Sequence, residues 1–321
     1  MGFSGVDPAR GEHDGDWKID AVRVRAAARS LAPHIRHTPL IASTNGGFVK
    51  LESLQPTGSF KVRGFFAAAL AIEPERRARG LLTVSAGNAA LACAYVAREL
   101  HVACRVLMFD SAPALKVRGV RALGAEAVLM PRERLLEWIA SRSWEREREV
   151  FIHPFADDDV ITGHATIAPE ILEDCPAVER VLVPVGGGGL ICGIAGALAT
   201  LRPGVRVVGV QSDGYPLWPR AFAEGGPVSL TPSTIADGTT APFDPVMFRR
   251  LEHCVEEWIV VSEADLRTAV SRLATELKVV AEGAGALAFA AMTGGQADAN
   301  TVAILSGSNI DGPRLAELLI Q

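Results

Sequence analysis

Short apolar runs alternate with segments of helical periodicity from residue 47 to the end of the chain. Runs such as "RVLVPV" are continuously apolar, as strands buried on both faces are, whereas "EADLRTAVSRLATEL" repeats its apolar residues at helical spacing. The segments expected as strands are 48–52, 80–85, 104–109, 126–130, 149–155, 180–185, 205–211, 258–261 and 301–305. The segments expected as helices are 88–100, 112–124, 132–144, 165–175, 190–201 and 263–277. This alternation predicts an α/β fold, with parallel sheets covered by helices on both faces.

A further helix is expected to begin near Lys61, within "TGSFKVRG", with Ser59 as its N-cap and a mostly apolar sequence to residue 72. Most lysines are solvated surface charges. A lysine at the start of a buried helix is different, because burial lowers its pKa and makes the neutral amine available as a nucleophile. The natural product of such an amine is a Schiff base with an aldehyde. Lys61 is therefore a candidate catalytic residue if the chain also binds an aldehyde.

The glycines between the expected strand 180–185 and the following helix could bind a phosphate group. The four consecutive residues are Gly186, Gly187, Gly188 and Gly189. They allow close backbone approach, and their N–H groups join the positive end of the helix. A flexible turn is the alternative, but a turn rarely needs four glycines. The spacing matches neither the dinucleotide fingerprint nor a P-loop.

A second glycine cluster, at Gly283, Gly285 and Ala288, does match G-x-G-x-x-A and supports a competing interpretation as a nicotinamide enzyme. Too few residues follow it for the βαβ unit that should hold the ribose. Close helix packing on small residues therefore explains this cluster better.

Two other loops directly follow expected strands. Ser85, Ala86, Gly87 and Asn88 precede an alanine-rich helix, where exposed N–H groups could hold a carboxylate, although Asn88 alone reads more simply as a helix cap. Ser306 follows the strand 301–305, at the end of a sheet where α/β proteins bind ligands, although an isolated serine there is more often a turn residue.

Composition narrows the classes of function. The 321 residues carry a formal net charge of -5 with 49% hydrophobic residues, and no basic block indicates nucleic-acid binding. The five cysteines are scattered, which predicts neither disulfides nor a zinc site. The most apolar run, "LICGIAGALATL", is too short to span a bilayer. We expect a cytoplasmic protein that acts on a small molecule, with no nucleic-acid or membrane partner.

The ordered motifs "GSFKVRG", "SAGN", "GGGGL" and "LSGSN" resemble those of fold-type II pyridoxal-phosphate enzymes, in particular the serine/threonine dehydratases and serine racemase. The resemblance covers the chain from about residue 30. It implies a tryptophan-synthase-β-like fold with two domains, each an open twisted sheet with helices on both faces. We expect a disordered arm at 1–16, a large pyridoxal-phosphate-binding domain at 17–74 and 153–321, and a small domain at 75–152. The stretch 212–245 is expected to be a long, turn-rich loop, and the enzyme a homodimer.

The resemblance also implies a role for each site residue. Lys61 would form the Schiff base with pyridoxal 5'-phosphate, Phe60 would flank the ring, Asn88 would bond its hydroxyl and Ser306 would meet its nitrogen. The cofactor phosphate would bind Gly186, Gly187, Gly188, Gly189 and Leu190. The substrate carboxylate would bind Ser85, Ala86, Gly87, Asn88 and Ala89.

The implied activity is β-elimination of water from a 3-hydroxy amino acid such as L-threonine or L-serine, giving a 2-oxo acid and ammonia. Three departures from the family pattern matter. Ala89 and Leu91 stand where members commonly have His and Gln, which would also admit a bulkier substrate such as an aryl-serine. Ala86 stands where racemases have a second serine, which disfavours the racemase alternative. Gln211 stands where several members have a carboxylate that binds a divalent cation, so no metal is expected. A β-replacement enzyme and a non-catalytic binder are the remaining alternatives.

Overall fold

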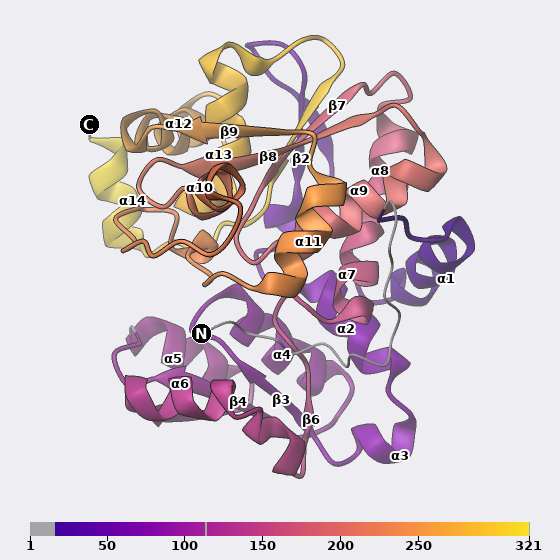
Figure 1. Cartoon of the computed structure of the whole chain (residues 1–321), viewed down its shortest axis with the longest axis vertical. Helices are drawn as coiled ribbons and strands as arrows, with labels where there is room; N and C mark the ends of the chain where they lie inside the picture. The colour runs from indigo at the N-terminus through magenta and orange to yellow at the C-terminus, as the bar shows by residue number, and fades with distance from the viewer. Residues whose placement is uncertain (1–16, 113, 321) are drawn as a thin grey trace.

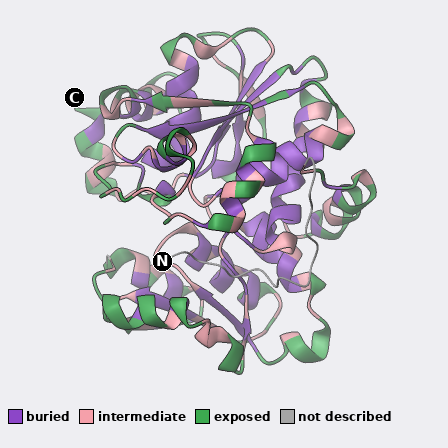
Figure 2. Cartoon of the chain, in the orientation of Figure 1, coloured by how far each residue is buried: buried purple, intermediate pink, exposed green. Residues whose placement is uncertain are grey.

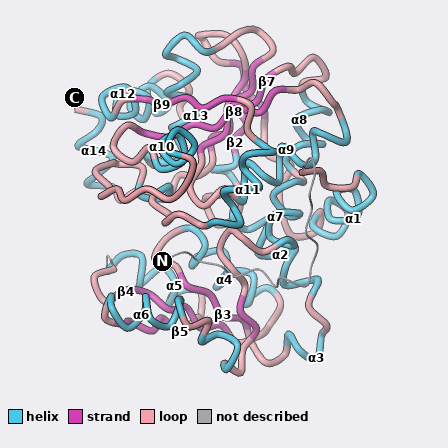
Figure 3. Tube along the Cα trace, viewed as in Figure 1, coloured by secondary structure: helices cyan, strands magenta, loops and turns pink. Residues whose placement is uncertain are grey.

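The computed structural model describes residues 17–112 and 114–320, and its strands form two separate sheets (Figures 1 and 3). The predicted arm at 1–16 lies outside the described residues. The larger sheet has the order β1 (Leu40–Ala42), β2 (Phe48–Leu51), β10 (Thr301–Leu305), β7 (Arg180–Pro184), β8 (Arg206–Ser212) and β9 (Glu257–Val261). The smaller sheet has the order β5 (Glu126–Met130), β4 (Cys104–Phe109), β3 (Leu81–Val84) and β6 (Val150–Phe151). All neighbouring strands are parallel except β1 and β2.

The large sheet is buried on both faces, as its continuously apolar strands predict. Val181 and Val183 of β7 pack into one core, whereas Leu182 between them packs into the other. The first core includes α7 (Asp158–Ala165), α8 (Ile167–Asp174), α9 (Gly189–Leu201), α10 (Leu217–Glu224), α11 (Pro245–Cys254) and part of α1 (Ala21–Leu31). The second includes α12 (Glu263–Thr275), α13 (Gly283–Ala291) and α14 (Gly312–Leu319). Figure 2 shows α9 and α13 as buried along almost their whole length.

The small sheet is covered in the same way. Leu81 of β3 packs with α2 (Lys61–Ala71), α4 (Asn88–Glu99) and α5 (Ala114–Ala122), and Leu82 packs with α6 (Arg132–Ala140) on the other face. The short helix α3 (Pro74–Arg77) connects α2 to β3 and has no buried residue. Helix α2 makes extensive contacts with both α7 and α4, so it joins the two parts of the molecule.

Each segment expected as a strand contains a strand, although β6 covers only two residues of 149–155. All six segments expected as helices contain one as well, and α2 starts at Lys61. The expected loop at 212–245 was wrong in part, because α10 and the short helix η3 (Asp237–Thr239) interrupt it. The strands β3 to β6 all fall within 75–152, but the domain boundaries themselves stay a prediction. In the part of the chain that the structure describes, no helix is both long and apolar enough to cross a membrane.

Candidate active site

A cavity of about 760 Å³ lies between the two sheets, at the carboxyl ends of their strands. Its large-sheet wall consists of Pro184, Gly186–Leu190, Asp237–Pro242, Glu282, Ala284, Ser306 and Asn309–Asp311. Its small-sheet wall consists of Val84–Ala89, Leu91, Phe109, Leu115, Lys116, Arg118, Gly119, Ala122 and Ile139. Phe60, Lys61, Pro154 and Phe155 lie where the walls meet. The structure thus brings every predicted site residue into one cavity, and their individual roles stay predictions.

Lys61 is the first residue of α2, and the start of this helix is tied to the end of β10. Phe60 donates its N–H to the carbonyl of Ser306 at 3.1 Å, and Ser59 forms an isolated bridge with Gly307. Ser59 is therefore not the N-cap, as the sequence suggested, because the N-cap position belongs to Phe60. The Lys61 Nζ donates to the carbonyl of Pro154 at 2.7 Å.

The amine of Lys61 is suited to proton transfer near neutral pH. Burial lowers its pKa from the ordinary value to about 8. The positive end of α2 disfavours the ammonium form in the same direction. A substantial fraction of the amine is therefore neutral at pH 8, and can bind an aldehyde or accept a proton.

A buried ionic network includes the first turn of α2. Arg63, two residues after Lys61, donates to both carboxylate oxygens of Glu52 at 2.8 Å and to Glu170 at 2.7 and 2.9 Å. Lys50 extends the network with a 2.9 Å ion pair to Glu170. Burial alone would raise the pKa of Glu52, but the charge of Arg63 holds it below its ordinary value. The network anchors the first turn of α2 and with it the position of Lys61.

The segment from His153 to Ala156 supplies the acceptor for Lys61. Burial and the charge of Lys61 lower the pKa of His153 to about 3, so the ring is neutral. Its Nδ1 accepts the N–H groups of Phe155 at 3.3 Å and Ala156 at 2.9 Å. This turn presses the Phe155 ring against Gly187, where any Cβ would overlap the ring. The conformation that positions Pro154 against Lys61 therefore also requires glycine at residue 187.

The glycine loop has the features of a phosphate site. No described residue accepts the backbone N–H groups of Gly186, Gly187 or Gly188, which precede the first turn of α9. Gly188 has a φ of 91°, which favours glycine. Trp218 fixes the loop by donating its Nε1–H to the carbonyl of Gly186 at 2.6 Å. Free N–H groups and a helix N-terminus are suited to a phosphate dianion, so these residues fit the phosphate of the expected cofactor.

Gln211, which stands where several family members have a cation-binding carboxylate, helps to hold this loop. Its side chain donates to the carbonyl of Val185 and accepts the N–H of Trp218, both at 2.9 Å. The amide therefore supports the glycine loop through Trp218. The expected lack of a metal stays a prediction.

Asn88 begins α4 and connects the two walls. Its side-chain amide donates to Glu282 at 2.5 Å, and its carbonyl accepts from the amide of Asn309 at 2.7 Å. Glu282 is buried, and burial raises its pKa to about 7. Next to it, the buried Ser306 Oγ lies 3.5 Å from the carbonyl of Ala284. Glu282 and Asn309 were missed by the sequence analysis, although Asn309 belongs to the quoted "LSGSN" motif.

The G-x-G-x-x-A cluster is explained by packing. A Cβ at Gly283 would overlap the carbonyl of Ile235, and a Cβ at Gly285 would overlap the carbonyl of Gly307. Both glycines lie in α13, and no strand directly precedes this helix. The nicotinamide interpretation is therefore wrong, because a dinucleotide site needs a strand, a glycine turn and a helix in that order.

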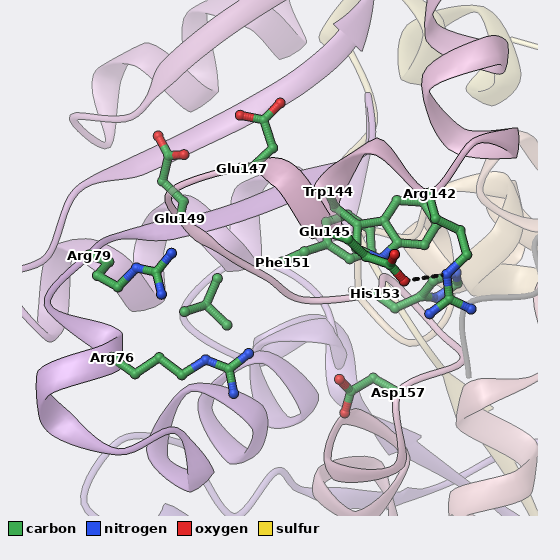
Figure 4. A pocket seen from close by; sticks show the side chains of 11 residues that line it. Arg76, Arg79, Arg142, Trp144, Glu145, Glu147, Glu149, Phe151, His153 and Asp157 are labelled. Carbon is green, nitrogen blue, oxygen red and sulfur yellow. Dashed lines mark hydrogen bonds and ion pairs between the residues drawn. The ribbon is translucent and has the colours of Figure 1, made fainter. Parts of the chain in front are cut away.

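A smaller cavity of about 360 Å³ lies between α3 and the segment from η2 (Ser143–Arg146) to His153 (Figure 4). Arg76 of α3 and Arg79, which follows this helix, extend toward it. Two of its acids, Glu147 and Glu149, are both paired with Arg105. None of the predicted site residues lines this cavity, so the larger one is the candidate site.

Comparison with known proteins gives consistent results. Residues 31–307 match the family model described as pyridoxal-phosphate dependent enzyme. The chain is 35% identical to the catabolic L-threonine dehydratase TdcB of Staphylococcus aureus (strain N315), over 92% of this chain and 90% of the relative. Its structure is similar to maize serine racemase, with a TM-score of 0.87, 29% identity and coverage of 95% and 98% of the two chains. It is also similar to the T.th. threonine deaminase, with a TM-score of 0.84, 35% identity and coverage of 91% and 99%.

Proposed function

The chain belongs to the pyridoxal-phosphate dependent enzymes, and from this premise we propose that it removes water from a 3-hydroxy amino acid, of which L-serine and L-threonine are the simplest. The products are a 2-oxo acid and ammonia. The observation that carries the proposal is the position of Lys61, whose amine lies in one cavity with the glycine loop, Ser306 and the start of α4. The relatives named threonine dehydratase and threonine deaminase support the same reaction.

The cofactor, when bound, supplies an electron sink for the pair released at the substrate Cα. Lys61 would bind the cofactor at rest and then accept the Cα proton as a neutral amine. The N–H groups at Gly186–Gly189 would hold the phosphate, and Ser306 and Asn88 would contact the ring.

The positive N-terminus of α4, with the loop from Ser85 to Ala89, would bind the substrate carboxylate. In the reaction the Cα–H and Cβ–O bonds break, the hydroxyl leaves with a proton as water, and a later water hydrolyses the resulting imine to release ammonia. The net change therefore needs no oxidant or reductant.

The racemase alternative is less favoured by this site, even though the fold is similar to that of serine racemase. Racemisation requires a donor on the face of the substrate away from Lys61. Ala86 has only a methyl group at the position where a racemase would have a serine. We therefore propose elimination as the main reaction.

The test is a substrate panel with the purified holoenzyme. L-Threonine and L-serine should yield 2-oxo acid and ammonia in equal amounts, and Lys61→Ala should abolish both while the protein stays folded by circular dichroism. Borohydride reduction followed by peptide mapping should find a pyridoxyl group on Lys61. A pyridoxyl group found only on another lysine would reject Lys61 as the cofactor lysine.

The proposal also includes the location of the enzyme in the cell and its oligomeric state. We propose that it works in the cytoplasm as a homodimer on a small-molecule substrate, as the family resemblance suggests. Analytical ultracentrifugation of the holoenzyme tests the dimer, and a single species with the mass of one chain would contradict it.

A further inference from the structure

The small-sheet wall is apolar beyond the loop that would bind the carboxylate. Val84 and Phe109 stand at the carboxyl ends of β3 and β4, and Ile139 reaches the cavity from α6. Leu91 and Leu115 add two further aliphatic side chains from α4 and α5. An apolar wall of this kind is typical of a site for an apolar ligand group, with polar groups at a few fixed points.

The position of Leu91 relates this wall to the substrate. It lies three residues after Asn88 on α4, so the two side chains share one face of the helix. A substrate held by its carboxylate at the start of α4 would therefore have Leu91 one turn away. Across from Leu91 stands Gly119 of α5, where a Cβ would lie only 3.1 Å from the Leu91 Cδ2. Glycine at this position lets α5 approach Leu91 without filling the space in front of it.

Leu115 shows that the wall is larger than a small substrate requires. Its side chain is 49% exposed although it borders the cavity, and Phe109 and Leu91, which line the same cavity, are only partly buried. The methyl group of threonine, or the hydrogen of serine, can cover little of this surface. A larger apolar group would remove these side chains from water, which is favourable in proportion to the area covered.

We infer that the preferred substrate is a 3-hydroxy amino acid with a bulky apolar group on its hydroxyl-bearing carbon, and that Leu91 and Leu115 determine this specificity. The inference rests on the proposed function, because it names the substrate class of that reaction.

The two cations of the wall do not favour an acidic substrate. Lys116 forms a 2.6 Å ion pair with Asp237 of the large-sheet wall, so its charge is already compensated. Arg118 lies on the same helix and is exposed to solvent, where a charge is well hydrated without a ligand. The remaining lining of this wall beyond the carboxylate loop is apolar. Because these two cations are nevertheless the groups that an acidic substrate would use, an acidic 3-hydroxy amino acid is the competing substrate that the test includes.

The experiment compares kcat/KM of the holoenzyme for L-threo-3-phenylserine, L-threonine and L-threo-3-hydroxyaspartate. The wild type should prefer phenylserine to threonine by about 10-fold or more, since even one methylene in an apolar pocket changes kcat/KM by about that factor. Leu91→Gln and Leu115→Gln should each lower the phenylserine-to-threonine ratio by about 10-fold. Leu115 is half-exposed, so that variant should fold even where Leu91→Gln does not.

Leu136→Gln is the matched control, because Leu136 is 41% exposed on α6 and does not line the cavity. It should leave the ratio unchanged. Isothermal titration calorimetry adds a readout without turnover, in which L-phenylalanine should bind more tightly than L-alanine and lose this advantage in the two cavity variants.

The outcomes separate the inference from the proposed function. Turnover of threonine equal to or faster than that of phenylserine, with a ratio unmoved by Leu91→Gln and Leu115→Gln, would overturn the apolar specificity and leave the elimination intact. A preference for 3-hydroxyaspartate would overturn it as well. If no 3-hydroxy amino acid reacts, the proposed function fails, and the calorimetric preference still decides whether the wall binds apolar side chains.

Discussion

The two walls of the cavity differ in the polarity of the groups that line them. The large-sheet wall presents backbone N–H groups and buried polar side chains, of which the glycine loop, Glu282 and Ser306 are examples. The small-sheet wall has one polar loop at the start of α4 and otherwise mostly apolar side chains, several of them partly exposed. The first wall is held by hydrogen bonds and close packing, whereas the second borders open space.

This difference suits the large-sheet wall to binding the cofactor and the small-sheet wall to selecting the substrate. Backbone donors on a glycine loop do not depend on side-chain identity, so the large-sheet wall suits a cofactor that does not change. Side chains on α4, α5 and α6 can be exchanged without disturbing those donors, so the small-sheet wall can adapt to the substrate. Changes in the large-sheet wall should therefore affect cofactor binding and stability, and changes in the small-sheet wall should affect which reaction or substrate is favoured.

The largest effect is expected for Gly187→Asp in the large-sheet wall. The new side chain would overlap the Phe155 ring and place a negative charge beside the phosphate site. Loss of charge-assisted hydrogen bonds and the added repulsion should weaken binding of pyridoxal 5'-phosphate by about 100-fold. Absorbance titration of the apoenzyme measures this. Gly312→Asp is the control, because a Cβ at residue 312 meets no atom within 4 Å. Unchanged affinity of Gly187→Asp for the cofactor would show that the phosphate does not bind at the glycine loop.

Glu282→Gln tests the buried carboxyl that joins the walls. The pKa of Glu282 is raised to about 7 in the folded protein, and the unfolded value is near 4.5. Between these values the folded state binds more protons, so the carboxyl contributes stability that is lost as the pH rises through 7. Ionisation of Glu282 at pH 8 therefore lowers the free energy of unfolding by roughly 3 kcal/mol at most. The glutamine variant does not titrate, so urea unfolding of the apoenzyme should show it more stable than the wild type at pH 8 and similar at pH 4.5.

The control for this prediction is Glu276→Gln. Its hydrogen bond to Arg272 holds the pKa of Glu276 below the ordinary value, so removal of this carboxyl should have the opposite sign at pH 8. If each substitution lowers the stability of the apoenzyme at pH 8, Glu282 is charged there and its charge is well compensated.

Ala86→Ser tests the small-sheet wall, where we expect a change of reaction and not of cofactor binding. A hydroxyl at this position could donate a proton to the substrate face away from Lys61, and positioned acid–base groups typically contribute about 10²–10⁴-fold. A serine not tuned for this role should fall short of this range, so we expect about a 10-fold rise in the ratio of racemisation to elimination.

Chiral chromatography of residual substrate, beside a 2-oxo acid assay, measures the ratio for Ala86→Ser. Ala122→Ser, which adds a hydroxyl farther along the same wall, is the control and should leave it unchanged. Rapid formation of D-serine by the unmodified enzyme would contradict the view that Ala86 suppresses racemisation.

The sequence predicted the elements that depend on local pattern. Lys61 at a helix start, the glycine loop before α9 and Ser306 after β10 could each be found from a strand, a turn and a helix in order. The α/β class was predicted from continuously apolar strands. Strand β1 was missed because three residues carry too little pattern, and α10 was missed because glycine and proline surround it. Helices α1, α3, α7, α11 and α14 were also not among the expected helices.

The contacts that complete the site could not be predicted because they are remote in sequence. Asn88 and Glu282 are separated by 194 residues, and Lys61 and Pro154 by 93. The network around Arg63 likewise joins β2, η1 (Glu52–Leu54), α2 and α8. A single sequence contains no signal for such pairs, although an acidic residue directly before a glycine-rich helix, as at Glu282, was an observable hint of a buried polar group.

The smallest expected effect concerns the ion pair that crosses from one wall to the other. Lys116 on α5 meets Asp237 of η3 at 2.6 Å, and the two side chains are 28% and 60% exposed. Exposed pairs contribute about 0.2–1 kcal/mol, so Lys116→Met and Asp237→Asn should each change the substrate KM by only about two- to fivefold. A double-mutant cycle isolates the pair, because the double variant should change KM no more than either single variant does. The coupling should shrink between about 0.05 and 0.5 M salt, whereas the effect of Gly187→Asp should persist because that contact is steric as well as electrostatic. Strictly additive effects at low salt would show that the ion pair does not hold the walls together, and would leave that role to contacts such as the Asn88–Glu282 hydrogen bond.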